Sequence, residues 1–336
     1  MKHVFLMSLV LSLVALIFSA SQAMAEAEGA HGMKEEKKAD RFGIVLAVFG
    51  TSHESALPAI LNIQNKVAAA FPHTPVKLAF TSNMIRKIWQ KRGADPAYVK
   101  AHPEVPREIL EVKGVLASIS DLQDKGVDYI VVQPVHMAAA EEYHDLASYV
   151  SALNSIRTMK PKNMPFKRIL LGRPIMGAYS LQHVYAEDLK TLAEVLAPDV
   201  QEAKAKGQAL VYMAHGNEYM PAGYYMELEH VMNQMYPDVK TFITMVEGFP
   251  GLNVLREKLR HIKAKRVVLR PLMVVAGDHA KNDMAGEEPD SIRSVLQKDG
   301  IQVNVELRGL GELNGFAELV ASHIRDAAVD AGVELR

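Results

Sequence analysis

Cysteine is absent from all 336 residues of the chain. Disulfides and thiolate ligands are therefore excluded, and any metal site must be built from histidine, carboxylate or other oxygen ligands. A strong basic excess is also missing, since the formal net charge is -1. That balance gives no support for nucleic-acid binding. A G-x-S-x-G turn and an H-E-x-x-H helix are both lacking, so a hydrolase is a weak hypothesis.

A long apolar run is lacking as well. The run Val4 to Phe18 is shorter than the roughly 20 residues that a membrane-spanning helix needs. It follows a short positive start and precedes Ala23-Met24-Ala25. This pattern predicts a secretory signal peptide over residues 1–25, cleaved near Ala25. We therefore expect a flexible leader over residues 26–40 and a periplasmic mature protein with no stable membrane span.

What the sequence does contain is a regular alternation of short apolar runs with longer helical patterns. Such a rhythm is typical of βαβ units around a parallel sheet. The runs expected to form strands begin at Phe42, Val76, Tyr129, Arg168, Ala209, Thr241, Arg266 and Val303. We predict an α/β fold of two similar lobes, each a four-stranded parallel sheet flanked by helices, with a cleft between them.

The expected domain boundaries follow from this series. An N-terminal lobe covers residues 41–177, and a linking helix covers 178–206. A C-terminal lobe with the metal site covers 207–314, and a C-terminal helix covers 315–336, which could return to the first lobe.

The two halves show weak internal similarity in the motifs that follow the runs. When the two halves are aligned by these motifs, four pairs of positions become equivalent. They are Phe49-Gly50 with His215-Gly216, Pro134 with Pro271, Glu142 with His279, and, approximately, Gly172-Arg173-Pro174 with Arg308-Gly309-Leu310.

Three potential ligand residues occupy strand ends in the second half. His215 and Glu247 end two predicted strands, and His279 follows a third. Ligands bind beyond the carboxyl ends of the strands in open α/β sheets, and neighbouring strands lie about 4.8 Å apart. The three side chains can therefore converge, and two imidazoles with one carboxylate suit a borderline divalent metal. We expect His215, Glu247 and His279 to be both metal ligands and catalytic residues.

Each of these residues also has a purely structural interpretation. His215 before a glycine could cap a turn, Glu247 could be a solvated loop carboxylate, and His279 could orient its loop by hydrogen bonds. Because the three residues follow consecutive strands in equivalent positions, a purely structural role for all of them is the less favoured interpretation.

The motifs around these residues are similar to those of the anaerobic (class II) sirohydrochlorin cobaltochelatases, which belong to the ferrochelatase-like superfamily. The matching segments are Phe49-Gly50-Thr51-Ser52, Met213-Ala214-His215-Gly216, Val246-Glu247-Gly248 and the stretch from Pro271 to Met284. The resemblance covers the chain from about Phe42 onwards.

The resemblance implies a tetrapyrrole in the cleft, with His215, Glu247 and His279 holding the metal. It implies insertion of Co²⁺ into sirohydrochlorin, with Fe²⁺ as an alternative metal and no nucleotide. The histidines would bind the metal and accept the pyrrole protons. The export signal departs from the family, because cobalamin synthesis is usually cytoplasmic.

Further residues are weaker candidates for substrate binding. His136 follows a strand and could line the opposite wall, while Arg86, Arg173 and Arg308 could pair with substrate carboxylates. Solvated surface charge is an equally good interpretation of each arginine. His102 lies on a predicted loop and could bind a second metal or an additional haem, although an ordinary exposed loop histidine is the favoured interpretation. The sequence is compatible with a homo-oligomer.

A carrier is the alternative function. A periplasmic two-lobed protein could bind a metal or a tetrapyrrole such as haem and deliver it without turnover. The open three-ligand site favours catalysis over such a carrier.

Overall fold

A computed structural model describes residues 40–178, 180–217 and 223–335 of the chain. The described residues from Arg41 onwards form one compact unit. The predicted signal peptide and nearly all of the leader lie outside the described residues. Within the described part, no helix has both the length and the apolar character needed to cross a membrane.

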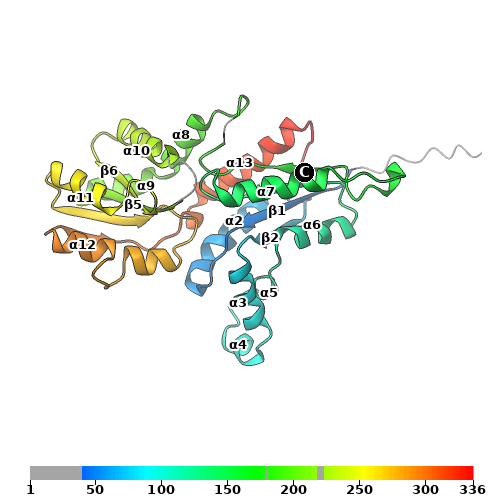
Figure 1. Cartoon of the computed structure of the whole chain (residues 1–336), viewed down its shortest axis with the longest axis horizontal. Coiled ribbons are helices and arrows are strands. Elements are labelled where there is room, and N and C mark those ends of the chain that lie inside the picture. The colour runs from blue at the N-terminus through cyan, green and yellow to red at the C-terminus, as the bar shows by residue number, and fades with distance from the viewer. Residues whose placement is uncertain (1–39, 179, 218–222, 336) are drawn as a thin grey trace, which may run out of the picture. The chain divides into compact units, whose positions relative to one another are not determined.

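Two four-stranded parallel sheets organise the unit (Figure 1). The first has the strand order β2-β1-β3-β4 and the second β6-β5-β7-β8. The predicted fold class is therefore confirmed. The strands are β1 Phe42–Val48, β2 Val76–Phe80, β3 Tyr129–Pro134, β4 Arg168–Leu171, β5 Ala209–Gly216, β6 Thr241–Glu247, β7 Arg266–Pro271 and β8 Gln302–Val305.

Strand register bears out the expected superposition of the halves. Ala47 of β1 pairs with Pro134 of β3, and Met213 of β5 pairs with Pro271 of β7 at the equivalent place. Counting on from these pairs puts Phe49 at the position of His215 and Glu142 at the position of His279. The alignment of the segments after the fourth strands differs from the prediction by one residue. The N–H of Ile175 donates to the carbonyl of His136, and the N–H of Leu310 donates to the carbonyl of Met273 at the equivalent place. Arg173 is therefore equivalent to Arg308.

Both faces of each sheet are buried, which explains why the strands are almost continuously apolar. Ile44 and Leu46 point to one face of β1, whereas Val45 and Ala47 point to the other. Leu210 and Tyr212 of β5 belong to the same apolar cluster as Ile44, so one core runs through both lobes. A separate cluster covers the far face of each sheet.

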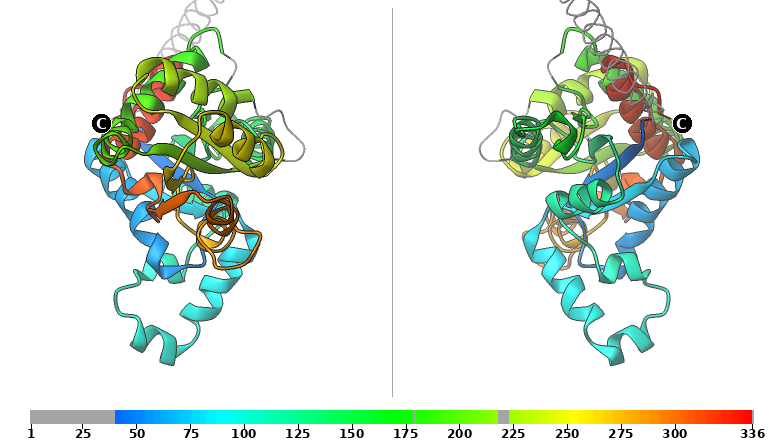
Figure 2. Two further views of the ribbon diagram at one scale, coloured as in Figure 1. Left: turned by 90° about the vertical axis from the view of Figure 1, so that its left-hand side faces the viewer. Right: turned by 90° about the vertical axis from the view of Figure 1, so that its right-hand side faces the viewer.

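Helices cover these faces (Figure 2). Those before β5 are α2 Leu57–Ala70, α3 Asn83–Gly93, α4 Pro96–Ala101, α5 Arg107–Leu110, α6 Val115–Asp124, α7 Glu141–Asn154, α8 Tyr185–Val195 and α9 Ala197–Lys206. Those after it are α10 Gly223–Met235, α11 Leu252–His261, α12 Ile292–Lys298 and α13 Asn314–Asp330. Short turns are η1 Glu54–Ala56, η2 Pro161–Asn163, η4 Leu310–Glu312 and a π-helical turn η3 Ala280–Met284.

The connection between the sheets differs from the single helix expected over residues 178–206. It holds two helices, α8 and α9, which meet at Leu196. Pro198 lies in the first turn of α9, where a backbone N–H would have no partner within the helix. Proline therefore favours the start of a new helix at this point. After the second sheet, α13 returns and packs on α2 and β3 of the first lobe.

Candidate functional site

The three predicted ligand residues meet at the carboxyl ends of the second sheet. His215 lies near the end of β5, Glu247 is the last residue of β6, and His279 precedes η3. Nδ1 of His215 is 3.8 Å from Oε2 of Glu247, and the rings of His215 and His279 lie edge to face with centroids 4.7 Å apart. Their side chains are between 40% and 45% exposed, so solvent and a ligand can reach them.

Gly216 allows the backbone to bring His215 and Glu247 together. Its φ is +83°, and a Cβ at this position would lie 1.8 Å from the carbonyl oxygen of Glu247. Only glycine tolerates both the left-handed conformation and this close approach. The glycine that follows His215 therefore has a structural reason tied to the site.

A carboxylate orients His279. Nδ1 of His279 lies 2.7 Å from Oδ2 of Asp283, four residues later and inside η3. This contact leaves Nε2 as the nitrogen available to a ligand. Sequence reasoning missed Asp283, although the spacing of four residues on a helical turn is a usable signal.

These three residues line a cavity of about 330 Å³ at the junction of the two halves of the chain. The first-lobe wall includes Phe49, which is 49% exposed and occupies the position equivalent to His215. Apolar groups such as Val274 and Val275 lie on the second-lobe side. The cavity therefore combines a polar ligand cluster with apolar surface, as is usual for small-molecule sites.

His136 lies in the opposite wall, as predicted, but its ring nitrogens are fully buried. Neither nitrogen has a hydrogen-bond partner among the described residues. Burial lowers the pKa of His136 to about 4, so the imidazole is neutral near neutral pH. Because the nitrogens are covered, the structure gives them no direct contact with the cavity.

Two other polar residues line the cavity, and Tyr225 of α10 was not among the predicted site residues. Glu142 lies in the first turn of α7, at the position equivalent to His279. Burial and then the charge of Glu142 raise the pKa of Tyr225, which keeps its hydroxyl protonated. The internal repeat in the sequence had already placed Glu142 at the position of His279.

The three predicted substrate arginines are absent from the residues that line this cavity. Arg173 forms ion pairs at 2.8 Å with Asp188 of α8 and Asp326 of α13. Arg308 pairs with the buried Asp199.

Arg86 is held by the backbone instead. It donates to the carbonyls of Phe80 and Thr81 at the end of β2, at 2.6 and 3.2 Å. The guanidinium groups of these three arginines already bind carboxylates or backbone carbonyls of the protein. We therefore do not propose them as ligands of the substrate carboxylates.

The loop that carries His279 also contacts the first lobe. Lys281 donates to Oγ of Ser55 at 2.7 Å, and Oδ1 of Asp278 lies 3.5 Å from Nε2 of His53. These contacts fix the loop against the segment that follows β1.

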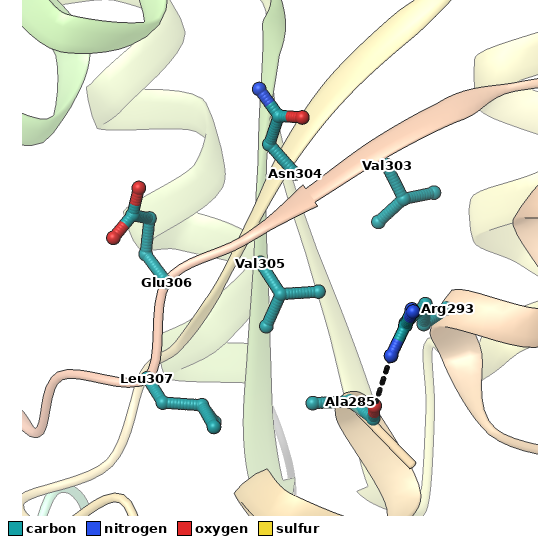
Figure 3. A pocket seen from close by; sticks show the side chains of 7 residues that line it. All are labelled: Ala285, Arg293, Val303, Asn304, Val305, Glu306 and Leu307. Atoms are coloured by element: carbon teal, nitrogen blue, oxygen red, sulfur yellow. Dashed lines mark hydrogen bonds between the residues drawn. The ribbon is translucent and has the colours of Figure 1, made fainter. Parts of the chain in front are cut away.

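A second hollow of about 520 Å³ lies along the edge strand β8 (Figure 3). Arg293 there donates to the carbonyl of Ala285 at 3.2 Å, and Glu306 is the one carboxylate among the lining residues. No histidine is among the residues that line it. Because this hollow lacks convergent ligands, we assign the site to the cavity that contains His215, Glu247 and His279.

Comparisons with known proteins identify the family of the chain. A family model described as cobalt chelatase (CbiK) matches residues 42–329. A sirohydrochlorin cobaltochelatase of Salmonella typhimurium is 28% identical, covering 84% of this chain and 95% of that protein. The sirohydrochlorin cobaltochelatase CbiKC of Nitratidesulfovibrio vulgaris is 26% identical over 86% of this chain and 91% of that protein.

A solved structure shows the same fold at low identity. The sirohydrochlorin chelatase SirB of Bacillus subtilis subspecies spizizenii, in complex with cobalt, superposes with a TM-score of 0.54 at 13% identity. The match covers 88% of this chain and 98% of that chain.

Proposed function

The chain belongs to the cobalt chelatase (CbiK) family, and we propose that it is a sirohydrochlorin cobaltochelatase that inserts Co²⁺ into sirohydrochlorin. The observation that carries this function is the meeting of His215, Glu247 and His279 in one cavity. Two imidazoles and one carboxylate provide nitrogen and oxygen ligands that suit borderline divalent ions such as cobalt.

In this proposal the three side chains receive the incoming dication. Glu247 supplies the negative charge, while His215 and His279 bind through neutral imidazole nitrogens. Three protein ligands leave coordination positions open for water and then for the pyrrole nitrogens. Asp283 accepts a hydrogen bond from Nδ1 of His279 and so directs Nε2 towards the ion.

Proton balance assigns the histidines a second task. The tetrapyrrole gives up two pyrrole protons and gains one Co²⁺, so the reaction releases two protons for each ion inserted. As the ion leaves an imidazole, that nitrogen can accept a proton near neutral pH. His215 is 45% exposed and His279 is 40% exposed, so each can pass its proton on to water.

Iron is the alternative metal for the same site, because imidazole and carboxylate accept Fe²⁺ as well as Co²⁺. Steady-state rates with each ion under oxygen-free conditions would rank the two. We expect cobalt to give the higher kcat/KM.

The decisive experiment is a turnover assay with purified protein, sirohydrochlorin and excess Co²⁺, following the absorbance change of the macrocycle. We expect many product molecules for each protein molecule, and no enzymatic rate from His279→Ala. Binding of metal or tetrapyrrole without turnover would instead establish the carrier function.

We also propose export to the periplasm. The support is the sequence pattern of a short basic start, an apolar run and Ala23-Met24-Ala25. Expression of the full chain, followed by fractionation and N-terminal sequencing, should yield a periplasmic protein beginning at Glu26. An uncleaved chain in the cytoplasm would contradict the proposal.

A further inference from the structure

A second group of ligand atoms lies outside the insertion site, on the first lobe. Among the described residues, the atoms of Glu54, His102 and Glu104 form the one group of three that all lie within 4.8 Å of one another. Glu54 begins η1 directly after the loop that follows β1, whereas His102 and Glu104 lie between α4 and α5. We propose that Glu54, His102 and Glu104 bind a second divalent cation of the cobalt or zinc class.

Both carboxylates face the same nitrogen. Nδ1 of His102 is 3.1 Å from Oε2 of Glu54 and 3.2 Å from Oε1 of Glu104. An imidazole nitrogen carries at most one hydrogen, so it can donate well to only one of two carboxylates. A dication in this place contacts all three ligand atoms and neutralises both negative charges.

Tyr98 holds two of the ligands in place without being a ligand itself. Its hydroxyl donates to Oε1 of Glu54 at 2.5 Å, and its ring stacks on that of His102 with centroids 4.2 Å apart. Burial and the hydrogen bond to Glu54 raise the pKa of Tyr98 to about 12, so the hydroxyl keeps its proton. The bond to Oε1 leaves Oε2 of Glu54 for His102 or a cation.

The backbone around His102 is fixed by local hydrogen bonds. The N–H of His102 donates to the carbonyl of Tyr98 at 3.0 Å, and its carbonyl accepts from Val105 at 3.2 Å. Arg92 is the neighbouring cation that stacks over the Tyr98 ring, and it donates to the carbonyl of Ser52 at 2.7 Å. The positive charge beside the cluster is therefore already engaged with the backbone.

The coordination expected here is one nitrogen and two oxygens, completed by water. Glu54 and His102 are about one-third exposed, and Glu104 is 64% exposed, so water can reach the open side. One imidazole with two carboxylates matches the preferences of Co²⁺ and Zn²⁺. Because no residue is shared with the insertion site, this binding does not depend on the proposed reaction.

The test counts Co²⁺ ions bound to the whole protein by equilibrium dialysis with metal analysis. A His215→Ala, His279→Ala background removes the insertion site. We expect this background to retain one ion per chain and to lose it when His102→Ala is added. A background variant that binds no Co²⁺, or that keeps its ion after His102→Ala, would overturn the proposal.

Glu104→Gln gives a milder test that preserves shape. We expect it to lower the affinity of the remaining site for Co²⁺ by about tenfold or more. Loss of a residue that only supports a metal ligand already lowers metal affinity by about tenfold, and Glu104 is proposed as a ligand itself. The matched control is Glu111→Gln, an exposed carboxylate that pairs with Arg107 and should leave the affinity unchanged. Equal affinity in Glu104→Gln and Glu111→Gln would show that the group is an ordinary ion pair.

Discussion

Oδ2 of Asp283 lies 2.7 Å from Nδ1 of His279, within one turn of the chain. A carboxylate in this place accepts the Nδ1 hydrogen and presents the lone pair of Nε2 to the cavity. Such a partner fixes the tautomer and the orientation of a metal-binding histidine.

Asp283→Asn should therefore impair insertion. The amide can donate to Nδ1 and favour the wrong tautomer, so we expect kcat/KM for Co²⁺ to fall by about 10- to 100-fold. Steady-state kinetics with varied Co²⁺ measure this effect. Asp290→Asn, a change at an exposed carboxylate, is the control. Similar kinetics in both variants would remove Asp283 from the site.

His215→Ala should abolish or severely reduce insertion while the fold survives. The side chain is 45% exposed, so its loss should change the free energy of unfolding by no more than about 0.5 kcal/mol. Turnover and thermal melting of the same sample separate the two effects, with the exposed His230→Ala as control. Near-normal turnover would exclude His215 from the mechanism.

Glu247→Gln should weaken metal loading more than tetrapyrrole binding. The change removes the negative charge beside His215 but keeps the shape of the side chain. Dissociation constants for Co²⁺ and for sirohydrochlorin, measured separately, test the difference. Equal changes in the two constants would show that Glu247 does not act through the metal.

Gly216→Ala should destabilise the protein and disturb the site together. The added Cβ meets the carbonyl oxygen of Glu247, and φ is positive. We expect a loss of at least about 1–3 kcal/mol in the free energy of unfolding from the backbone conformation alone. Urea unfolding measures it, and Gly223→Ala is the control because a Cβ there meets no neighbouring atom within 4 Å. Equal stability of the two variants would contradict this role for Gly216.

His136 should make the protein sensitive to acid. Burial lowers its pKa to about 4 in the folded state, whereas an unfolded histidine titrates at about 6.5. The unfolded state thus takes up this proton first, and stability present above pH 6.5 is lost as the pH falls towards about 4. The loss amounts to about 3 kcal/mol.

The comparison for this prediction is His136→Leu, an apolar replacement at a buried position. The free energy of unfolding, measured in urea at pH 7 and pH 4.5, should fall less in the variant than in the wild type. Identical pH dependence in the two proteins would show that His136 is not the group responsible.

The sequence predicted the strands well because their signal is local. Each buried parallel strand needs apolar side chains on both faces, so the runs starting at Phe42 and Ala209 are visible without any tertiary information. The strand starts predicted at Phe42 and Ala209 match the first residues of β1 and β5. The second helix of the connection, α9, was not predicted as a separate element.

The meeting of His215, Glu247 and His279 was also predictable. Parallel strands end at one edge of a sheet, so the ends of β5 and β6 and the loop after β7, which carries His279, lie at the same edge. The sequence thus determined the sheet, its internal repeat and the place where these three side chains lie.

The tertiary structure alone decided the partners of the remaining charged side chains. Arg173 binds Asp326 across 153 positions of the chain, and Glu54 meets His102 across 48. Such pairs depend on how helices pack, and no local pattern of apolar and polar residues encodes that packing. For the same physical reason, composition could not show whether a charged side chain faces the cavity or is already paired inside the fold.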